Sequence, residues 1–201
     1  MSLTKFGVFL DADGVLWPDI GAGGILKGIT EAKKRLSQLI ETVGNREKTF
    51  IGVVTNQTLA ARAEIPYKEF EFRVFSLFDE LKRELLIDDF RACFHHPNAS
   101  YLPLRVDDCL CRKPRPGMIN ELLASHDLHT RRTVIIGDRI TVVLAGRKAN
   151  LDEAILLFSN RMLEVNIGSN YEEWSQLIQF KVAKDFSESL VILKHWMGND
   201  R

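Results

Sequence analysis

The hydrophobic pattern of the chain changes period repeatedly, and this alternation is the strongest constraint on its fold. Short apolar runs rich in Val, Ile and Phe, such as residues 5–10 and 49–55, are typical of buried strands. Longer segments between them carry apolar residues at helical spacing, as residues 29–43 do before Gly44 and Asn45 end the pattern. Strands that are apolar throughout and alternate with helices indicate a parallel sheet covered on both faces.

The same pattern predicts an ordered series of elements. Strands are expected at residues 5–10, 49–55, 89–94, 133–136 and 153–158. Helices are expected at 29–43, 66–86, 116–128, 139–149, 171–177 and 187–197. We therefore predict an α/β fold of three layers, with a Rossmann-like parallel sheet and helices on both faces. Because the chain has no repeat, linker or low-complexity tract, residues 1–201 are expected to form a single domain.

Composition argues against several classes of partner. The 27 Lys and Arg residues balance 27 Asp and Glu residues, whereas binding nucleic acid or an anionic membrane by bulk electrostatics needs a surplus of cations. No apolar segment is long enough to cross a bilayer, and the N-terminus lacks the pattern of a signal peptide. We expect a cytoplasmic protein with neither kind of partner. The sequence does not indicate its oligomeric state.

Polar residues follow the predicted strands at the edge where a parallel sheet binds ligands. Asp11 and Asp13 come directly after the first strand, and Thr55-Asn56-Gln57 ends the second. Gly137-Asp138 follows the fourth strand, and Lys113 lies in a proline-rich loop before a helix. Carboxylates at a buried strand end are costly unless they bind a cation or react. Carboxylates with a lysine and a threonine predict a site for Mg²⁺ and a phosphate group.

All three cysteines lie between the start of the third predicted strand and the helix predicted at 116–128. Cys93-x-His95 and Cys109-x-Cys111 supply four ligands of the kind that tetrahedral zinc prefers, so we predict a zinc-binding loop within residues 93–111. Three ordinary buried cysteines and a loop histidine remain the alternative. His96 is expected to be a supporting or surface group. No role is assigned to the three other histidines, His126, His129 and His195.

The order of Asp11-x-Asp13-Gly14-Val15, Thr55-Asn56-Gln57, Lys113 and Gly137-Asp138 resembles the four motifs of the haloacid dehalogenase superfamily. His95-His96-Pro97 and Cys111-Arg112-Lys113-Pro114-x-Pro116-Gly117 resemble the branch that holds the histidinol-phosphate and D-glycero-D-manno-heptose 1,7-bisphosphate phosphatases.

The resemblance implies a phosphatase with an aspartyl-phosphate intermediate. Asp11 would be the nucleophile and Asp13 the general acid and base, while Thr55 and Lys113 would bind the transferring phosphoryl group. Asp11, Asp138 and the main-chain carbonyl of Asp13 would hold Mg²⁺. The four Cys and His ligands would hold a structural zinc ion. The rest of the substrate would be bound by Asn56, Arg62 and Arg112.

The sequence departs from the branch at several positions. Val142 replaces an acid usually found four residues after Asp138, which predicts weaker Mg²⁺ binding. Ala12 replaces arginine, Trp17 replaces asparagine, the segment after Trp17 is short, and Leu59 and Ala63 replace glycines. These pocket changes make specificity the property least defined by the resemblance.

No large cap insertion lies between Asp13 and Thr55 or between Thr55 and Lys113, so the predicted site is open unless a partner or the zinc loop covers it. The expected substrate is a small phosphomonoester, either a sugar phosphate or a bisphosphate such as heptose 1,7-bisphosphate. Histidinol phosphate is the alternative substrate. A catalytically impaired phosphate-binding or scaffold protein of the same fold is the alternative function. A phosphotransferase or mutase would need a second group to receive the phosphoryl, and the sequence offers none.

Overall fold

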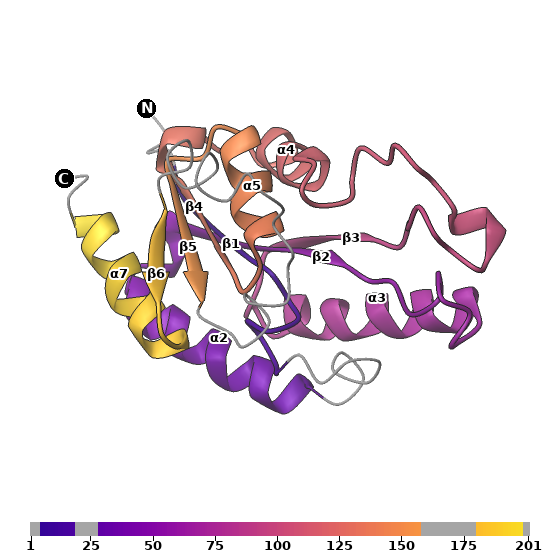
Figure 1. Cartoon of the computed structure of the whole chain (residues 1–201). Helices are drawn as coiled ribbons and strands as arrows, with labels where there is room; N and C mark the ends of the chain where they lie inside the picture. The colour runs from indigo at the N-terminus through magenta and orange to yellow at the C-terminus, as the bar shows by residue number, and fades with distance from the viewer. Residues whose placement is uncertain (1–4, 19–27, 158–179, 199–201) are drawn as a thin grey trace.

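The computed structural model describes residues 5–18, 28–157 and 180–198 (Figure 1). Its centre is a six-stranded sheet in the order β3-β2-β1-β4-β5-β6, in which all neighbouring strands are parallel. The strands are β1 (Phe6–Leu10), β2 (Thr49–Asn56), β3 (Asp89–Cys93), β4 (Thr133–Gly137), β5 (Glu153–Leu157) and β6 (Lys181–Ala183).

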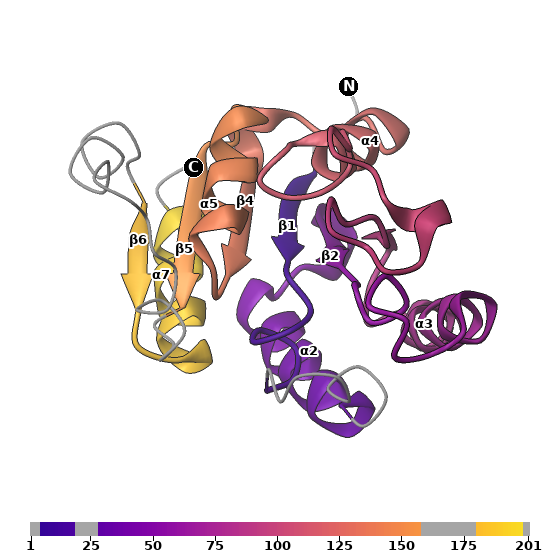
Figure 2. The ribbon, with the colours of Figure 1, turned by 45° about the vertical axis from the view of Figure 1, so that its right-hand side comes forward.

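Helices cover both faces of this sheet. They are α2 (Ile29–Val43), α3 (Tyr67–Arg83), α4 (Gly117–Ser125), α5 (Ile140–Lys148) and α7 (Phe186–Gly198). Figure 1 and Figure 2 show α2, α3 and α7 on one face and α4 and α5 on the other. Short 3₁₀ turns at Arg46–Lys48, Leu102–Leu104 and Thr130–Arg132 join the larger elements.

The alternation of side chains along each strand divides the core in two. In β1, Val8 and Leu10 pack with the helices α2, α3 and α7, whereas Phe9 packs with α4 and α5. In β4, Ile136 packs with α2, α3 and α7, whereas Ile135 packs with α4 and α5. Because successive side chains of a strand point to opposite faces, a strand buried on both sides must be apolar throughout. This requirement explains why the strands were evident in the sequence.

The predicted fold class is confirmed, and the predicted elements that fall within the described residues are present with small shifts at their ends. The largest shifts are in α3, which ends at Arg83 rather than at residue 86, and in α4, which ends at Ser125 rather than at residue 128. Strand β6 was not predicted, because its three residues are too short for a recognisable pattern. The predicted helix at 171–177 and residues 19–27, part of the short segment after Trp17, lie outside the described residues. Among the helices described, none is long and apolar enough to span a membrane.

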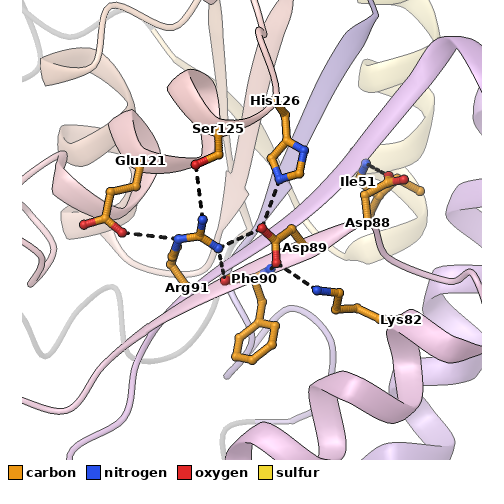
Figure 3. A network of polar contacts seen from close by, with 9 residues as sticks. All are labelled: Ile51, Lys82, Asp88, Asp89, Phe90, Arg91, Glu121, Ser125 and His126. Atoms are coloured by element: carbon orange, nitrogen blue, oxygen red, sulfur yellow. Dashed lines mark hydrogen bonds and ion pairs between the residues drawn. The ribbon is translucent and has the colours of Figure 1, made fainter.

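A polar network lies at the amino-terminal end of β3 (Figure 3). The predicted site lies at the other end of the strands. Asp89 accepts hydrogen bonds from Lys82 of α3 at 3.1 Å and from Arg91 at 2.8 Å. Its Oδ2 also lies 2.9 Å from Nε2 of His126, which follows α4. Arg91 in turn pairs with Glu121 of α4 at 3.2 Å. The network therefore ties one helix from each face to the edge strand.

Candidate active site and metal-binding cluster

Asp11 stands at the carboxyl end of β1, the strand between β2 and β4. Its backbone N–H donates to the carbonyl oxygen of Ile136 at 2.9 Å, which extends the pairing of β1 with β4 by one residue. The N–H of Ala12 donates to Asp11 Oδ1 at 2.8 Å. The carboxylate is thus buried at a fixed position on the sheet edge.

Lys113 reaches the same carboxylate from the segment between β3 and α4. Its Nζ lies 2.6 Å from Asp11 Oδ1 and donates to the carbonyl oxygen of Val54 at 2.7 Å. The exposed fractions of the Lys113 and Asp11 side chains are 2% and 8%. Removing two charges from water costs several kcal/mol per ion, roughly balanced at best by their attraction. Such a pair is therefore a candidate for function rather than a source of stability.

Asn56 fixes the backbone of Lys113. The Lys113 N–H donates to Asn56 Oδ1 at 3.1 Å, and Asn56 Nδ2 donates to the Lys113 carbonyl oxygen at 3.2 Å. The peptide bond from Lys113 to Pro114 is cis. Asn56, predicted to bind substrate, thus has both polar side-chain atoms on the main chain of the predicted phosphate-binding lysine.

Asp13 accepts hydrogen bonds from Trp17 and Gln57, and neither contact was predicted from the sequence. Trp17 Nε1 donates to Asp13 Oδ1 at 2.7 Å, and Gln57 Nε2 donates to Asp13 Oδ2 at 2.9 Å. Gln57 Nε2 also donates to Thr55 Oγ1 at 2.9 Å. The available sequence signals were the position of Gln57 in the Thr-Asn-Gln motif and the unusual tryptophan at 17.

Asp138 follows β4 and lies against the turn that carries Asp13. Gly14 in this turn has φ of +81°, and a Cβ built on it would stand 2.1 Å from Asp138 Oδ2. Glycine is therefore required both for the backbone conformation and for the close approach. Asp11 and Asp138 are both buried at adjacent strand ends. With the Asp13 carbonyl they supply hard oxygen ligands of the type that Mg²⁺ prefers, so the residues fit this cation.

Val142, which replaces the usual acid, is fully buried in the core formed with α4 and α5. A Cβ built on Gly137 would lie 2.5 Å from Val142 Cβ, so the valine packs directly on the end of β4. The side chain at this position contributes packing instead of a carboxylate.

The four predicted zinc ligands, Cys93, His95, Cys109 and Cys111, converge, and their ligand atoms all lie within 4.8 Å of one another. The shortest separation is 2.9 Å, between the sulfurs of Cys111 and Cys93, and the longest is 3.9 Å, from Cys93 Sγ to His95 Nδ1. Ligands of a tetrahedral zinc at a Zn–S distance of ~2.3 Å are about 3.8 Å apart. The donor set therefore fits zinc, and two separations from Cys93 Sγ, 3.8 Å to Cys109 Sγ and 3.9 Å to His95 Nδ1, match this value, while the other four are shorter.

Within this cluster the ionisation of Cys111 is disfavoured. A hydrogen bond to Cys93, together with burial, raises the pKa of the Cys111 thiol. Thiolates this close together need a cation between them, and a zinc ion supplies it.

Arg112 joins the cluster to the predicted site. It follows Cys111 directly, and its Nη1 donates to the carbonyl oxygen of His95 at 3.0 Å. Burial lowers the pKa of Arg112, and the charge of Arg62 contributes in the same direction. Burial and the charges of Arg112 and Arg62 also lower the pKa of His96. Arg62 is 62% exposed and lies 3.8 Å from Glu64. Both predicted substrate-binding arginines therefore lie near His96 and near each other.

Comparisons with known proteins agree with this arrangement. The model of the HAD-hydrolase-like family matches residues 110–159, which include Lys113 and Asp138. The D-glycero-β-D-manno-heptose-1,7-bisphosphate 7-phosphatase of Helicobacter pylori strain J99 is 30% identical over 165 residues, covering 80% of this chain and 87% of that protein. The enzyme of the same name from H. pylori strain 26695 is 27% identical over 193 residues, covering 95% and 99%.

Solved structures share the fold. A HAD-like phosphatase from Mesorhizobium loti, 25% identical, has a TM-score of 0.72 over 98% of this chain and 87% of its own. A D,D-heptose 1,7-bisphosphate phosphatase from B. bronchiseptica, solved with magnesium and phosphate, has a TM-score of 0.63 at 19% identity, covering 94% and 98%. The chain thus belongs to the haloacid dehalogenase superfamily, in its heptose bisphosphate phosphatase branch, and is a phosphoric monoester hydrolase.

Proposed function

We propose that this protein is a Mg²⁺-dependent phosphatase that hydrolyses a sugar bisphosphate such as heptose 1,7-bisphosphate through an aspartyl-phosphate on Asp11. The observation that carries the proposal is the buried contact of Lys113 with Asp11, at 2.6 Å, beside the strand end that supplies Thr55. The names of the relatives supply the substrate class.

In the first half-reaction the Asp11 carboxylate attacks phosphorus. Because Oδ1 accepts hydrogen bonds from Lys113 and from the Ala12 N–H, the attack falls to Oδ2. The new Asp11–phosphorus bond forms as the bond from phosphorus to the ester oxygen breaks, and Asp13 gives its proton to that oxygen. In the second half-reaction Asp13 takes a proton from water, whose oxygen displaces Asp11 and releases inorganic phosphate.

Lys113 and Thr55 hold the phosphoryl group during both transfers. The Lys113 ammonium neutralises charge on the phosphoryl oxygens, and the Thr55 hydroxyl donates to one of them. Asp11, Asp138 and the Asp13 carbonyl would hold Mg²⁺, which would supply positive charge that offsets the repulsion of the anionic carboxylate and the anionic substrate. Asn56 acts by placing Lys113, because its amide is bonded to the lysine backbone.

Zinc held by Cys93, His95, Cys109 and Cys111 has a structural role in this proposal. Four protein ligands close the coordination shell and leave no position for a reacting water. A zinc ion held there would fix the 93–111 loop, and Arg112 and Lys113 follow the last ligand directly. Arg112 and Arg62 bind the part of the substrate that does not react, and their positive charge suits the second phosphate of a bisphosphate.

The test is phosphate release from sugar phosphates, sugar bisphosphates and histidinol phosphate, each with Mg²⁺ and with EDTA. We expect metal-dependent release that is strongest with a sugar bisphosphate. Asp11→Asn removes the nucleophilic oxygen while preserving shape, so it is expected to abolish release and leave the circular dichroism spectrum unchanged.

The control and the contrary outcomes are specific. Phosphate release by Asp11→Asn at the wild-type rate would show that Asp11 is not the nucleophile. Fastest release from histidinol phosphate would make histidinol phosphate, and not a sugar bisphosphate, the proposed substrate. No release from any ester by the wild-type protein would favour an inactive phosphate-binding protein, with Val142 in place of an acid as its cause.

A further inference from the structure

Each carboxylate oxygen of Asp13 accepts a hydrogen bond, and these two donors come from different parts of the chain. The indole N–H of Trp17 bonds to Oδ1 at 2.7 Å, and the amide of Gln57 bonds to Oδ2 at 2.9 Å. A carboxylate with a single donor can rotate about that bond. Bonds to both oxygens fix the plane of the group as well as its position.

The Trp17 ring is itself immobilised. Its side chain is fully buried in the core, where its centroid lies 6.2 Å from that of Phe78. The N–H of Gly14 donates to the carbonyl oxygen of Trp17 at 2.8 Å, which closes the turn and brings residue 17 back to residue 13. A buried indole N–H requires an acceptor, and here that acceptor is the predicted acid and base.

Gln57 extends this support to the predicted phosphate-binding residue. The same Nε2 donates to Asp13 Oδ2 and to Thr55 Oγ1, both at 2.9 Å. The position of the Asp13 carboxyl group is therefore tied to the position of the threonine that holds the phosphoryl group. Trp17 provides the other half of the support from the core side.

We propose that Trp17 is a positioning residue for Asp13, a role that rests on the proposed phosphatase function. Its indole N–H holds the carboxyl group in the orientation that delivers a proton to the ester oxygen of the substrate. The effect of losing this bond depends on the leaving group. An alkoxide leaves only with a proton from Asp13, whereas 4-nitrophenolate is weakly basic and leaves without one.

The experiment compares Trp17→Phe with the wild-type protein on two esters, using kcat/KM because it reports the first phosphoryl transfer. The esters are the best alkyl phosphate of the panel and 4-nitrophenyl phosphate. The variant keeps an aromatic ring but lacks the N–H. We expect kcat/KM to fall about tenfold or more for the alkyl ester and by about threefold at most for 4-nitrophenyl phosphate.

Phe78→Leu is the matched control, because it loosens the same part of the core without removing a donor to Asp13. We expect it to change both esters by the same factor. An equal loss on both esters in Trp17→Phe would make Trp17 a structural residue and overturn the proposal. Full retention of activity on both esters in Trp17→Phe would also overturn the proposal.

A second measurement does not depend on turnover. In ¹⁵N-labelled protein the indole N–H resonance of Trp17 is expected to shift in Asp13→Asn. The Trp196 indole donates to Asp152 at 2.7 Å and serves as an internal reference that should not move. An unchanged Trp17 resonance would refute the contact. A wild-type protein inactive on every ester would refute the phosphatase function, and with it the catalytic purpose of the contact, even if the resonance shifts.

Discussion

At the scale of single residues, the buried pair of Lys113 and Asp11 places an energetic cost at the centre of the candidate site. A well-packed apolar pair at such a place is often as stable as the ion pair or more so. Lys113 also satisfies the carbonyl oxygen of Val54. We therefore expect Lys113 to affect the free energy of unfolding mainly because its removal would leave the Asp11 carboxylate and the Val54 carbonyl oxygen without this partner.

Lys113→Met leaves the Asp11 carboxylate buried without its cation. We expect the free energy of unfolding to fall by about 3 kcal/mol, the usual cost of breaking a buried pair from one side. The double variant Asp11→Asn/Lys113→Met removes both charges and should recover much of this loss, although neither variant is active. Urea denaturation of the wild-type protein and the three variants measures the coupling. A double variant no more stable than Lys113→Met would show that the charges do not interact.

At the scale of elements, the 93–111 loop joins the end of β3 to the residues that precede α4. Its two pairs of ligands are separated in sequence but meet in space, so that a bound ion would close a loop in the chain. Closing a loop by a metal stabilises the fold by reducing the freedom of the unfolded chain. The loop also determines where Arg112 and Lys113 stand.

The wild-type protein is expected to hold one zinc ion per chain. Cys109→Ala is expected to reduce this zinc content and to lower the Tm. Loss of activity is expected to follow from the loss of zinc. Leu110→Ala is the matched control, because this neighbouring side chain is 69% exposed and is not a ligand. Elemental analysis and thermal unfolding of both variants provide the measurement. If Cys109→Ala retains a full equivalent of zinc, the ligand assignment is wrong.

The network around Asp89 belongs to the same scale, since it joins α3, β3 and the end of α4 (Figure 3). Burial alone would raise the pKa of Asp89, but the hydrogen bonds from His126 and Arg91, supported by Phe90 and Lys82, outweigh it and hold the pKa well below its usual range. A carboxyl group with a lowered pKa stabilises the folded state while it is ionised.

The stabilisation by Asp89 is therefore fully present above about pH 4, the pKa of an unfolded aspartate, and is lost as the pH falls below that value. We expect Asp89→Asn to be less stable than the wild-type protein at pH 7, with a difference that shrinks between about pH 4 and pH 2. Asp79→Asn, which removes an exposed carboxylate of α3, should show no such narrowing. Urea denaturation at a series of pH values tests this, and a difference independent of pH would refute it.

At the scale of the whole molecule, the candidate site and the polar network of Asp89 lie at opposite ends of the strands of the sheet. The carboxyl ends of β2, β1 and β4 carry the candidate site, and the network of Asp89 lies where β3 begins. The fold class and most elements could be predicted because parallel strands buried on both faces leave a continuous apolar signal. Strand β6 gives no such signal, since two of its three residues are exposed.

Within the site, the sequence predicted which residue types come together but not every contact among them. The roles of Asp11, Asp13, Lys113 and Asp138 remain predictions that follow from motif order. The Trp17 contact depends on a turn at Gly14 with positive φ, which reverses the chain in a way that hydrophobic periodicity does not register. The bond from Asn56 to Lys113 depends likewise on the path of an irregular segment.

The position of β1 between β2 and β4 has a consequence for the order of assembly during synthesis. β1 can pair with β2 as soon as both are made, but its pairing with β4 joins Gly7 to Thr133 and Leu10 to Ile136. At ribosomal rates of ~5–20 residues per second, roughly 6 to 25 s separate the two strands. Until then the backbone N–H and C=O groups on one edge of β1 stay unpaired, which leaves this strand prone to aggregation. The predicted nucleophile Asp11 is thus made more than 100 residues before Lys113 and Asp138, which complete its environment.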